Sequence, residues 1–472
     1  MTPPPELTRT RAIILAAGLG TRMKSRLPKV LHPICGRPMI DYVLDAADAA
    51  TGSRPIVVWS PAVESVRDAV AGRAETVCQA EPRGTGDALA AALAALPAEP
   101  GRRAASAAPT ELLVLSGDVP LVGPDLLDEL LEAHRAAGAA VSFVTVVTTH
   151  PGRLGRVIRD DDGQVERIVE ARDATDDELE IDEINGGLYA FDAAWLRGRI
   201  EDLVPSAATG ELYLTELVAF SRADGRAVGT FEVGDVGTLD GINDRAQLAE
   251  ATFVLQARIN ERHLLAGVTM FDPTTAHVDA LVLLEPDVTL EPNVILRGST
   301  RIGSRTLIGA GSQVVDSTIG RDCLIRASVI ESSEVEDEVQ IGPYSHLRPG
   351  SSIGRGAKLG NYAEVKNSRL GPGVQQHHMS YLGDATVGAR TNIGAGTITA
   401  NYDGRRKKRT TIGEDAFIGV DTMLIAPIEI GPGARTGAGA VVNRDVPAGK
   451  LAVGVPARLR DPRPEPDEPL GG

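Results

Sequence analysis

Hydrophobic residues in the C-terminal half of the chain recur at every sixth position. The longest series consists of Val335, Ile341, Leu347, Ile353, Leu359 and Val365. The same period joins Ile302, Ile308 and Val314, and later Ile412, Ile418, Leu424 and Ile430. A period of six fits neither the 3.6 residues of an α-helix nor the alternation of a strand. It is typical of hexapeptide repeats, which predict a parallel β-helix with these aliphatic side chains stacked inside.

Two stretches interrupt this period. The first lies between Leu370 and Val387 and contains residues 375–384, and the second lies between Ile398 and Ile412 and contains residues 401–409. Segments inserted into a regular solenoid often carry its function. We therefore expect both stretches to project as loops and to hold functional side chains.

The N-terminal half alternates short apolar runs with helical periodicity. The apolar runs that predict buried strands are 12–15, 55–59, 112–115 and 141–147. The amphipathic stretches between them that predict helices are 41–50, 62–70, 87–96 and 125–137. Alternation of this kind predicts an α/β domain with a parallel, Rossmann-like sheet and ligands at the carboxyl ends of its strands.

One helix is expected between the two halves, at residues 244–265. Its apolar residues fall at three- and four-residue steps, and it would be about 30 Å long. We interpret it as a connecting arm, and the alternative is an ordinary packed helix of the first domain. The expected division is a disordered extension (1–10), an α/β domain (11–243), a linker helix (244–265), a β-helix domain (266–460) and a disordered tail (461–472).

Charge and composition narrow the function. The chain has 472 residues and a formal net charge of −16, which argues against nucleic acid or an anionic membrane as a partner. The segment from Leu7 to Ile40 is the exception, with seven Arg or Lys residues and no acid. Three well-separated cysteines and the lack of an apolar leader or membrane-length apolar run predict a cytoplasmic protein.

The basic segment contains a glycine-rich turn directly after the first predicted strand. Leu15, Ala16, Ala17 and Gly18 lead into it, and Arg22 and Lys29 follow. Glycine lets backbone N–H groups close around a phosphate, which the two cations then neutralise. Neither Gly-x-Gly-x-x-Gly nor a Walker motif is present. The segment resembles the motif of sugar-nucleotide pyrophosphorylases.

A carboxylate follows another buried strand, at Asp118. It is expected at the ligand edge of the sheet, where Mg²⁺ takes one or two carboxylates together with substrate phosphates. The sequence therefore predicts a magnesium site beside the glycine-rich turn.

Further motifs make the resemblance specific. Segments 79–86, 154–156, 169–175, 183–186 and 241–245 follow one another in the order typical of uridyltransferases. With the β-helix behind them, residues from about Arg11 to Pro456 resemble the family of bifunctional bacterial enzymes that combine N-acetylglucosamine-1-phosphate uridyltransferase with glucosamine-1-phosphate acetyltransferase. The resemblance implies a left-handed β-helix, a homotrimer and synthesis of UDP-N-acetylglucosamine, which feeds cell-wall synthesis.

The resemblance also implies roles for residues of the first domain. Arg22 and Lys29 would act in catalysis, and Asp118 and Asn243 would ligate Mg²⁺. The residues implied to bind UTP or UDP-N-acetylglucosamine are Leu15, Ala16, Ala17, Gly18, Lys29, Gln79, Gly84, Thr85, Gly155, Glu170, Asn185 and Asn243. Two departures concern the sugar: Gly186 stands where threonine is common, and Leu212 replaces the first tyrosine of a common pair.

In the second domain, His378 lies in the first interruption, and its imidazole suits a general base. The resemblance gives it that role, with Glu364 assisting. Glucosamine 1-phosphate would be bound by Arg348, Lys366, Tyr381, Asn392 and Lys407. Acetyl-CoA would be bound by Ala395, Asn401, Tyr402, Val420 and Ala438. Val420 replaces a common serine and Gly454 a common arginine, which are departures on the coenzyme side.

Two alternatives remain open from the sequence. The first is a nucleotidyltransferase with one activity, acting on another sugar 1-phosphate, whose β-helix is only structural. The second is a scaffold or sensor that retains inactive sites. The interrupting segments disfavour the first, and the retained Arg22, Lys29, Asp118 and His378 disfavour the second.

Overall fold

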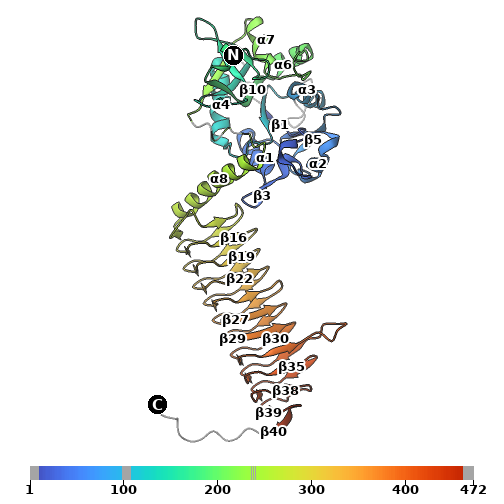
Figure 1. The fold of residues 1–472 in the computed structure, drawn as a ribbon, viewed down its shortest axis with the longest axis vertical. Helices are drawn as coiled ribbons and strands as arrows, with labels where there is room; N and C mark the ends of the chain where they lie inside the picture. The colour runs from blue at the N-terminus through green and yellow to red at the C-terminus, as the bar shows by residue number, and fades with distance from the viewer. Residues whose placement is uncertain (1–9, 98–107, 235–236, 238, 240, 461–472) are drawn as a thin grey trace, which may run out of the picture. The chain divides into compact units, whose positions relative to one another are not determined.

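A computed structural model describes residues 10–97, 108–234, 237, 239 and 241–460 (Figure 1). The expected C-terminal tail lies outside the described residues, as does the N-terminal extension except Thr10, which begins the first strand. The described residues form two compact units, and the division between them falls after Leu255, inside helix α8 (Arg245–Leu265).

The first unit is an α/β sandwich around a mixed sheet. The strand order is β11-β7-β10-β6-β1-β4-β5, with β8 paired to β10 and β9 to β8. The strands are β1 (Thr10–Leu15), β4 (Ile56–Trp59), β5 (Glu75–Cys78), β6 (Glu111–Ser116), β7 (Val141–Val147), β8 (Arg156–Arg159), β9 (Val165–Val169), β10 (Glu183–Asp192) and β11 (Val228–Glu232). The helices are α1 (Met39–Thr51), α2 (Ser65–Ala69), α3 (Thr85–Ala95), α4 (Pro124–Ala137), α5 (Asp176–Leu179), α6 (Ala193–Arg199) and α7 (Glu216–Ala223).

The expected strands and helices of this unit are present, but the sheet is not wholly parallel. β1 pairs with β4 and β6 in parallel, as the alternation predicted, whereas β10 runs antiparallel to both β6 and β7. The aromatic rings of Phe143, Tyr189 and Phe191 pack together on β7 and β10. Burying these three rings fills the centre of the core and holds β10 between its neighbours.

The second unit is a parallel β-helix, as the six-residue period predicted. Its strands stack in parallel from one coil to the next: Ile302 pairs with Ile319, and Ile319 with Val335. The aliphatic residue of each hexad points inward and is buried. Stacking of similar side chains along one axis gives every coil the same core, which is why so short a repeat suffices.

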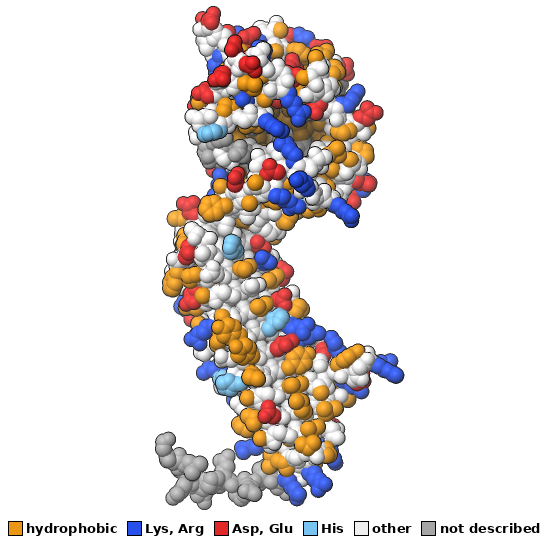
Figure 2. All heavy atoms as spheres, viewed as in Figure 1, with side chains coloured by type: hydrophobic (Ala, Val, Ile, Leu, Met, Phe, Trp, Pro, Cys, Tyr) orange, Lys and Arg blue, Asp and Glu red, His pale blue; other side chains and the backbone are white. Residues whose placement is uncertain are grey.

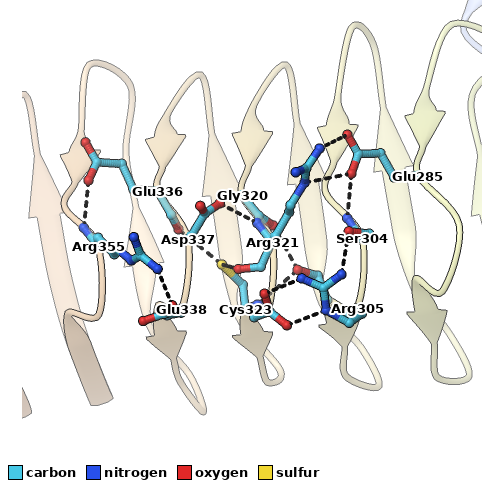
Figure 3. A network of polar contacts seen from close by, with 12 residues as sticks. Glu285, Ser304, Arg305, Gly320, Arg321, Cys323, Glu336, Asp337, Glu338 and Arg355 are labelled. Carbon is cyan, nitrogen blue, oxygen red and sulfur yellow. Dashed lines mark hydrogen bonds and ion pairs between the residues drawn. The ribbon is translucent and has the colours of Figure 1, made fainter.

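Polar side chains on the outside link successive coils (Figure 3). Arg305 contacts Asp322 of the next coil at 2.7 Å, and Glu338 accepts from Arg355 of the next coil. Arg321 reaches past one coil to contact Glu285 at 3.1 Å. These pairs are well exposed, so water and salt screen them and they contribute little to stability. The stacked aliphatic core, not this ladder of ion pairs, holds the coil together.

The prediction of a projecting loop at residues 375–384 is wrong. Residues Gln375–Gly383 form strand β29, which pairs in parallel with β27 (Lys358–Lys366). Gln376 takes the inward position between Leu359 and Ile393. Its amide donates to Ser380 Oγ at 2.9 Å inside the β-helix. The six-residue apolar period is not visible here because its inward position is polar. A hydrogen bond inside the coil takes the place of apolar stacking at this position.

The second interruption does project. A β-bridge between Tyr402 and Lys407 closes a small hairpin. The hairpin projects from the β-helix between β32 (Ile398–Ala400) and β33 (Thr410–Ile412) (Figure 1). Asp403 accepts from the backbone N–H groups of Arg405 and Arg406 and from Lys408 Nζ, and these contacts lower its pKa to about 2. The carboxylate therefore braces a hairpin whose tip is basic.

Candidate functional site

A cavity of about 590 Å³ opens at the carboxyl ends of β1 and β6 in the first unit. Figure 2 shows a hollow on this unit bordered by basic side chains. The predicted residues that line the cavity are Leu15, Ala16, Ala17, Gly18, Lys29, Gln79, Gly84, Thr85, Asp118, Glu170 and Asn185. The fold therefore gathers residues from distant parts of the sequence around one space large enough for a nucleotide sugar.

The glycine-rich turn is shaped by its approach to Lys29. Gly20 has a φ of 59°, and a Cβ there would lie 2.6 Å from Lys29 Cβ. Any larger residue would displace the lysine. Gly18, by contrast, faces open space at the cavity, where its backbone is free to approach a ligand.

Lys29 lies at the centre of a polar cluster at the cavity floor. Its ammonium donates to Asp118 Oδ2 and, at 3.0 Å, to Asn243 Oδ1. Arg22 Nη2 reaches the same Asn243 oxygen at 2.9 Å. Neither Arg22 nor Asn243 lines the cavity: Asn243 contacts Lys29, which does, and Arg22 contacts Asn243. Two cations and two side chains with oxygen acceptors thus meet beside the glycine-rich turn.

The donor set at this cluster suits a hard divalent cation. Asp118 offers a carboxylate braced by Ser116 Oγ at 2.5 Å, and Asn243 offers an amide oxygen. The described residues contain no cluster of three or more His, Cys, Asp or Glu side chains that could bind a metal ion. Mg²⁺ fits such a pair because it commonly keeps waters and binds substrate phosphates as further ligands.

The loop that precedes α3 carries Gln79 and Gly84, and Thr85 is the first residue of the helix. Gly84 has a φ of 119°, and a Cβ there would lie 2.7 Å from the backbone nitrogen of Leu212. Thr85 Oγ1 accepts from the N–H of Leu214 at 3.1 Å. The segment 212–214 therefore contacts this loop through its backbone, so leucine at position 212 in place of tyrosine leaves the contact intact.

Glu170 and Asn185 form the opposite wall of the cavity. Burial raises the pKa of Glu170 above its ordinary value, and Thr215 Oγ1 donates to it at 3.1 Å. Asn185 donates to Tyr189 Oη at 2.5 Å and accepts from the N–H of Gly187 at 3.0 Å. Gly155 does not line the cavity but accepts a backbone hydrogen bond from Asn185 at 2.9 Å.

The sequence prediction missed Tyr189 and Thr215 in this wall. Tyr189 lies four residues after Asn185 on β10, but the strand register shifts between them, so their contact could be found only from the structure. Thr215 lies in an irregular segment and could be found only from its contact with Glu170. Gly186 does not line the cavity, and a Cβ there would lie 2.7 Å from Leu239 Cδ1, so a threonine would require Leu239 to move.

A second cluster lies on one face of the β-helix. Arg348 Nη1 contacts Glu364 Oε1 at 2.9 Å, and Glu364 is the strand neighbour of Tyr381. The neighbouring Lys407, then Arg348, lowers the pKa of Lys366 below its ordinary value. Positive charges held so close together favour a multiply charged anion such as a phosphate.

His378 lies on β29, three residues before Tyr381, at a corner of the β-helix where the next residue, Met379, has a φ of 29°. It pairs with Asn361 of β27 and is exposed, and its imidazole has no hydrogen-bond partner among the described residues. His377 instead bonds to Gln375 Oε1 at 2.7 Å, and burial lowers its pKa. The free imidazole is therefore that of His378.

The predicted coenzyme residues follow His378 down the same corner. The next coil places Ala395 there, because Gly396 N–H donates to the carbonyl of Met379 at 3.0 Å. Val420 and Ala438 follow in the next two coils, since Asp421 N–H donates to Ala395 and Gly439 N–H to Val420. Ala395, Val420 and Ala438 therefore stack in one column of successive coils that begins at His378. Gly454, with a φ of 94°, lies beyond the column.

The remaining predicted residues lie apart from this column. Asn401 donates to Asp384 at 2.5 Å, and Tyr402 Oη to the carbonyl of Gly404 at 2.8 Å, at the base of the basic hairpin. Asn392 of β31 (Asn392–Ile393) pairs with Gln375, six residues before Tyr381 along β29, whereas Tyr381 pairs with Ile398 of β32. A single chain therefore does not pair Asn392 with the cationic cluster.

Known protein families match both the α/β unit and the β-helix. Residues 12–178 match the MobA-like NTP transferase domain, and residues 332–367 and 409–444 match the bacterial transferase hexapeptide repeat. Fold, sites and matches define a nucleotidyltransferase domain joined to a hexapeptide-repeat transferase domain.

Full-length relatives identify the family. The chain is 44% identical over 445 residues to "Bifunctional protein GlmU" of Pelobacter propionicus, covering 94% of this chain and 95% of the relative. It is 42% identical to the protein of that name from Heliobacterium modesticaldum, covering 94% of each chain. For that of Mycobacterium tuberculosis the identity is 41%, covering 94% of this chain and 90% of the relative. The chain belongs to the GlmU family of bifunctional enzymes. Within the described residues, no helix is long and apolar enough to cross a membrane.

Proposed function

We propose that the chain carries out two successive transfers at the two sites described above. The β-helix acetylates glucosamine 1-phosphate with acetyl-CoA, and the α/β unit transfers uridylyl from UTP to the resulting N-acetylglucosamine 1-phosphate. The observation that carries this proposal is the pair of cationic clusters, one around Lys29 and one around Lys366, each beside the groups its chemistry needs.

In uridyl transfer, an oxygen of the sugar phosphate attacks the α-phosphorus of UTP in line and pyrophosphate leaves. Such a reaction needs positioned positive charge more than covalent help. Lys29 and Arg22, held together through Asn243, supply that charge, and the glycine-rich turn binds the triphosphate through its backbone. Asp118 and Asn243 would hold Mg²⁺, which adds neutralising charge at the phosphates when bound.

Recognition of the two substrates is divided between the cavity walls. Gln79, Gly84 and Thr85 bind the uridine, while Gly155, Glu170 and Asn185 bind the N-acetylglucosamine. The hydrogen bonds that hold Asn185 and Glu170 in place support this division.

In acetyl transfer, the amine of glucosamine 1-phosphate attacks the thioester carbonyl, its proton passes to His378, and the coenzyme thiolate leaves. Glu364 assists the base, and Arg348, Lys366, Tyr381, Asn392 and Lys407 hold the sugar phosphate. The corner formed by Ala395, Val420 and Ala438 binds acetyl-CoA, together with Asn401 and Tyr402. Because Asn392 pairs with Gln375 and not with Tyr381, a homotrimer in which a neighbouring copy supplies it fits the site best.

The test supplies glucosamine 1-phosphate, acetyl-CoA, UTP and Mg²⁺ to the full chain. Free thiol and pyrophosphate are measured together, and the proposal expects both. Pyrophosphate alone, from a supplied sugar 1-phosphate, would instead indicate a nucleotidyltransferase with a structural β-helix. Release of neither product would indicate a scaffold.

A further inference from the structure

The side-chain amide of Gln79 is held in one orientation by two acceptors. Its Nε2 donates to the carbonyl oxygen of Gly84 at 3.1 Å and to Asp87 Oδ2 at 2.7 Å. A carbonyl and a carboxylate can only accept hydrogen bonds, so the nitrogen must face them. Gln79 is almost fully buried, and the Asp87 side chain is only 13% exposed, which keeps water from competing for these contacts.

This orientation leaves a defined pair of groups for a ligand. Within the described residues, Gln79 Oε1 and the backbone N–H of Gly84 have no hydrogen-bond partner, and both residues line the cavity. The protein therefore presents one acceptor and one donor at the place where a nucleobase would bind.

That pair is complementary to an imide edge. Uracil offers an N3–H donor beside a carbonyl acceptor, which match Gln79 Oε1 and the Gly84 N–H respectively. Cytosine in the same pose would set its N3 lone pair against Oε1 and its exocyclic amine against the N–H group. Both contacts would then be repulsive, and buried polar groups would remain unpaired.

We propose that Asp87 is the positioning residue that makes the cavity select uracil over cytosine. The inference rests on the proposed uridyl transfer in this cavity. Asp87 does not touch the base. It acts by preventing the Gln79 amide from turning its NH₂ group toward the ligand, a turn that would suit the N3 of cytosine.

Arg83 offers a matched control on the same carboxylate. Its Nη2 lies 2.6 Å from Asp87 Oδ1, the oxygen that Gln79 does not use, and its side chain is 62% exposed. Replacing Arg83 removes a surface partner of Asp87 and leaves the bond to Gln79 in place.

The experiment measures kcat/KM for UTP and for CTP by pyrophosphate release, using the full chain with N-acetylglucosamine 1-phosphate and Mg²⁺. We expect Asp87→Ala to lower the ratio of UTP to CTP efficiency about tenfold, which is the worth of one hydrogen bond. Asp87→Asn, which can still accept, should fall between this variant and the wild type. Arg83→Ala should keep the wild-type ratio.

A merely structural role for Asp87, at the start of α3, would lower both efficiencies by the same factor. An unchanged UTP-to-CTP ratio in both Asp87 variants would therefore overturn the inference and leave the proposed function intact. Asp87→Asn keeps the size of the side chain and carries the test if Asp87→Ala does not fold. Failure of the wild type to release pyrophosphate from UTP would overturn the proposed function itself.

Discussion

Removing the negative charge of Asp118 tests the centre of the nucleotidyl site. We expect Asp118→Asn to lower the rate of uridyl transfer by at least about 10³-fold. The site loses the carboxylate that would bind the metal, which is also the charged partner that orients Lys29. Acetyl transfer by the same molecules should be unchanged, since Asp118 belongs to the first compact unit.

The same change should also destabilise the first unit. The Lys29 and Asp118 side chains are only 16% and 10% exposed, so the substitution leaves a largely buried ammonium without its counter-charge. Breaking such a pair costs about 3 kcal/mol. For a unit of this size that corresponds to a fall of about 6–12 °C in Tm.

Scanning calorimetry and two product assays check both effects. Pyrophosphate release reports uridyl transfer, thiol release reports acetyl transfer, and calorimetry reports the unfolding of each unit. Asp161→Asn, an exposed change in the turn between β8 and β9, is the matched control and should leave all three unaltered. Uridyl transfer within tenfold of the wild type would refute the role of Asp118. A parallel loss of acetyl transfer would show that the change acts through general unfolding.

Three further predictions concern other parts of the two sites. His378→Ala should lower the rate of acetyl transfer by about 10²–10⁴-fold and leave uridyl transfer to supplied N-acetylglucosamine 1-phosphate unchanged. His377→Ala is the control. Undiminished thiol release by the His378 variant would show that His378 is not the base. Lys407→Ala should raise the KM for glucosamine 1-phosphate about tenfold and leave that for acetyl-CoA unchanged, and equal shifts in both would speak against a phosphate contact. Glu170→Gln should weaken sugar binding yet raise the Tm of the first unit at pH 7.5, because burial raises the pKa of Glu170 and its ionised form is therefore disfavoured in the folded state. Stability from a raised pKa is present below the unfolded value and lost as the pH rises through the folded one, so this gain in Tm should vanish at pH 4, and a gain that persists there would contradict it.

The sequence by itself determined the architecture and predicted the chemistry of each site. The six-residue period of the aliphatic residues predicted the β-helix, because only a stacked coil places every sixth side chain on one axis. The glycine-rich turn after a buried strand predicted a phosphate site, together with Arg22 and Lys29. Backbone N–H groups in such a turn and two nearby cations together favour binding of an anion. These features are local, and a local pattern can be recognised without knowing what lies across the fold.

Only the tertiary structure decided how residues far apart in the chain meet. The contacts of Lys29 with Asp118 and Asn243 join segments 89 and 214 residues apart, and no pattern along the chain records that distance. Strand β29 looked like a loop because Gln376 broke the apolar period, although its amide finds a partner inside the β-helix. The hydrogen bond from Gln79 to Asp87 is equally invisible in the sequence, because the orientation of an amide is set by the acceptors around it and not by its neighbours in the chain.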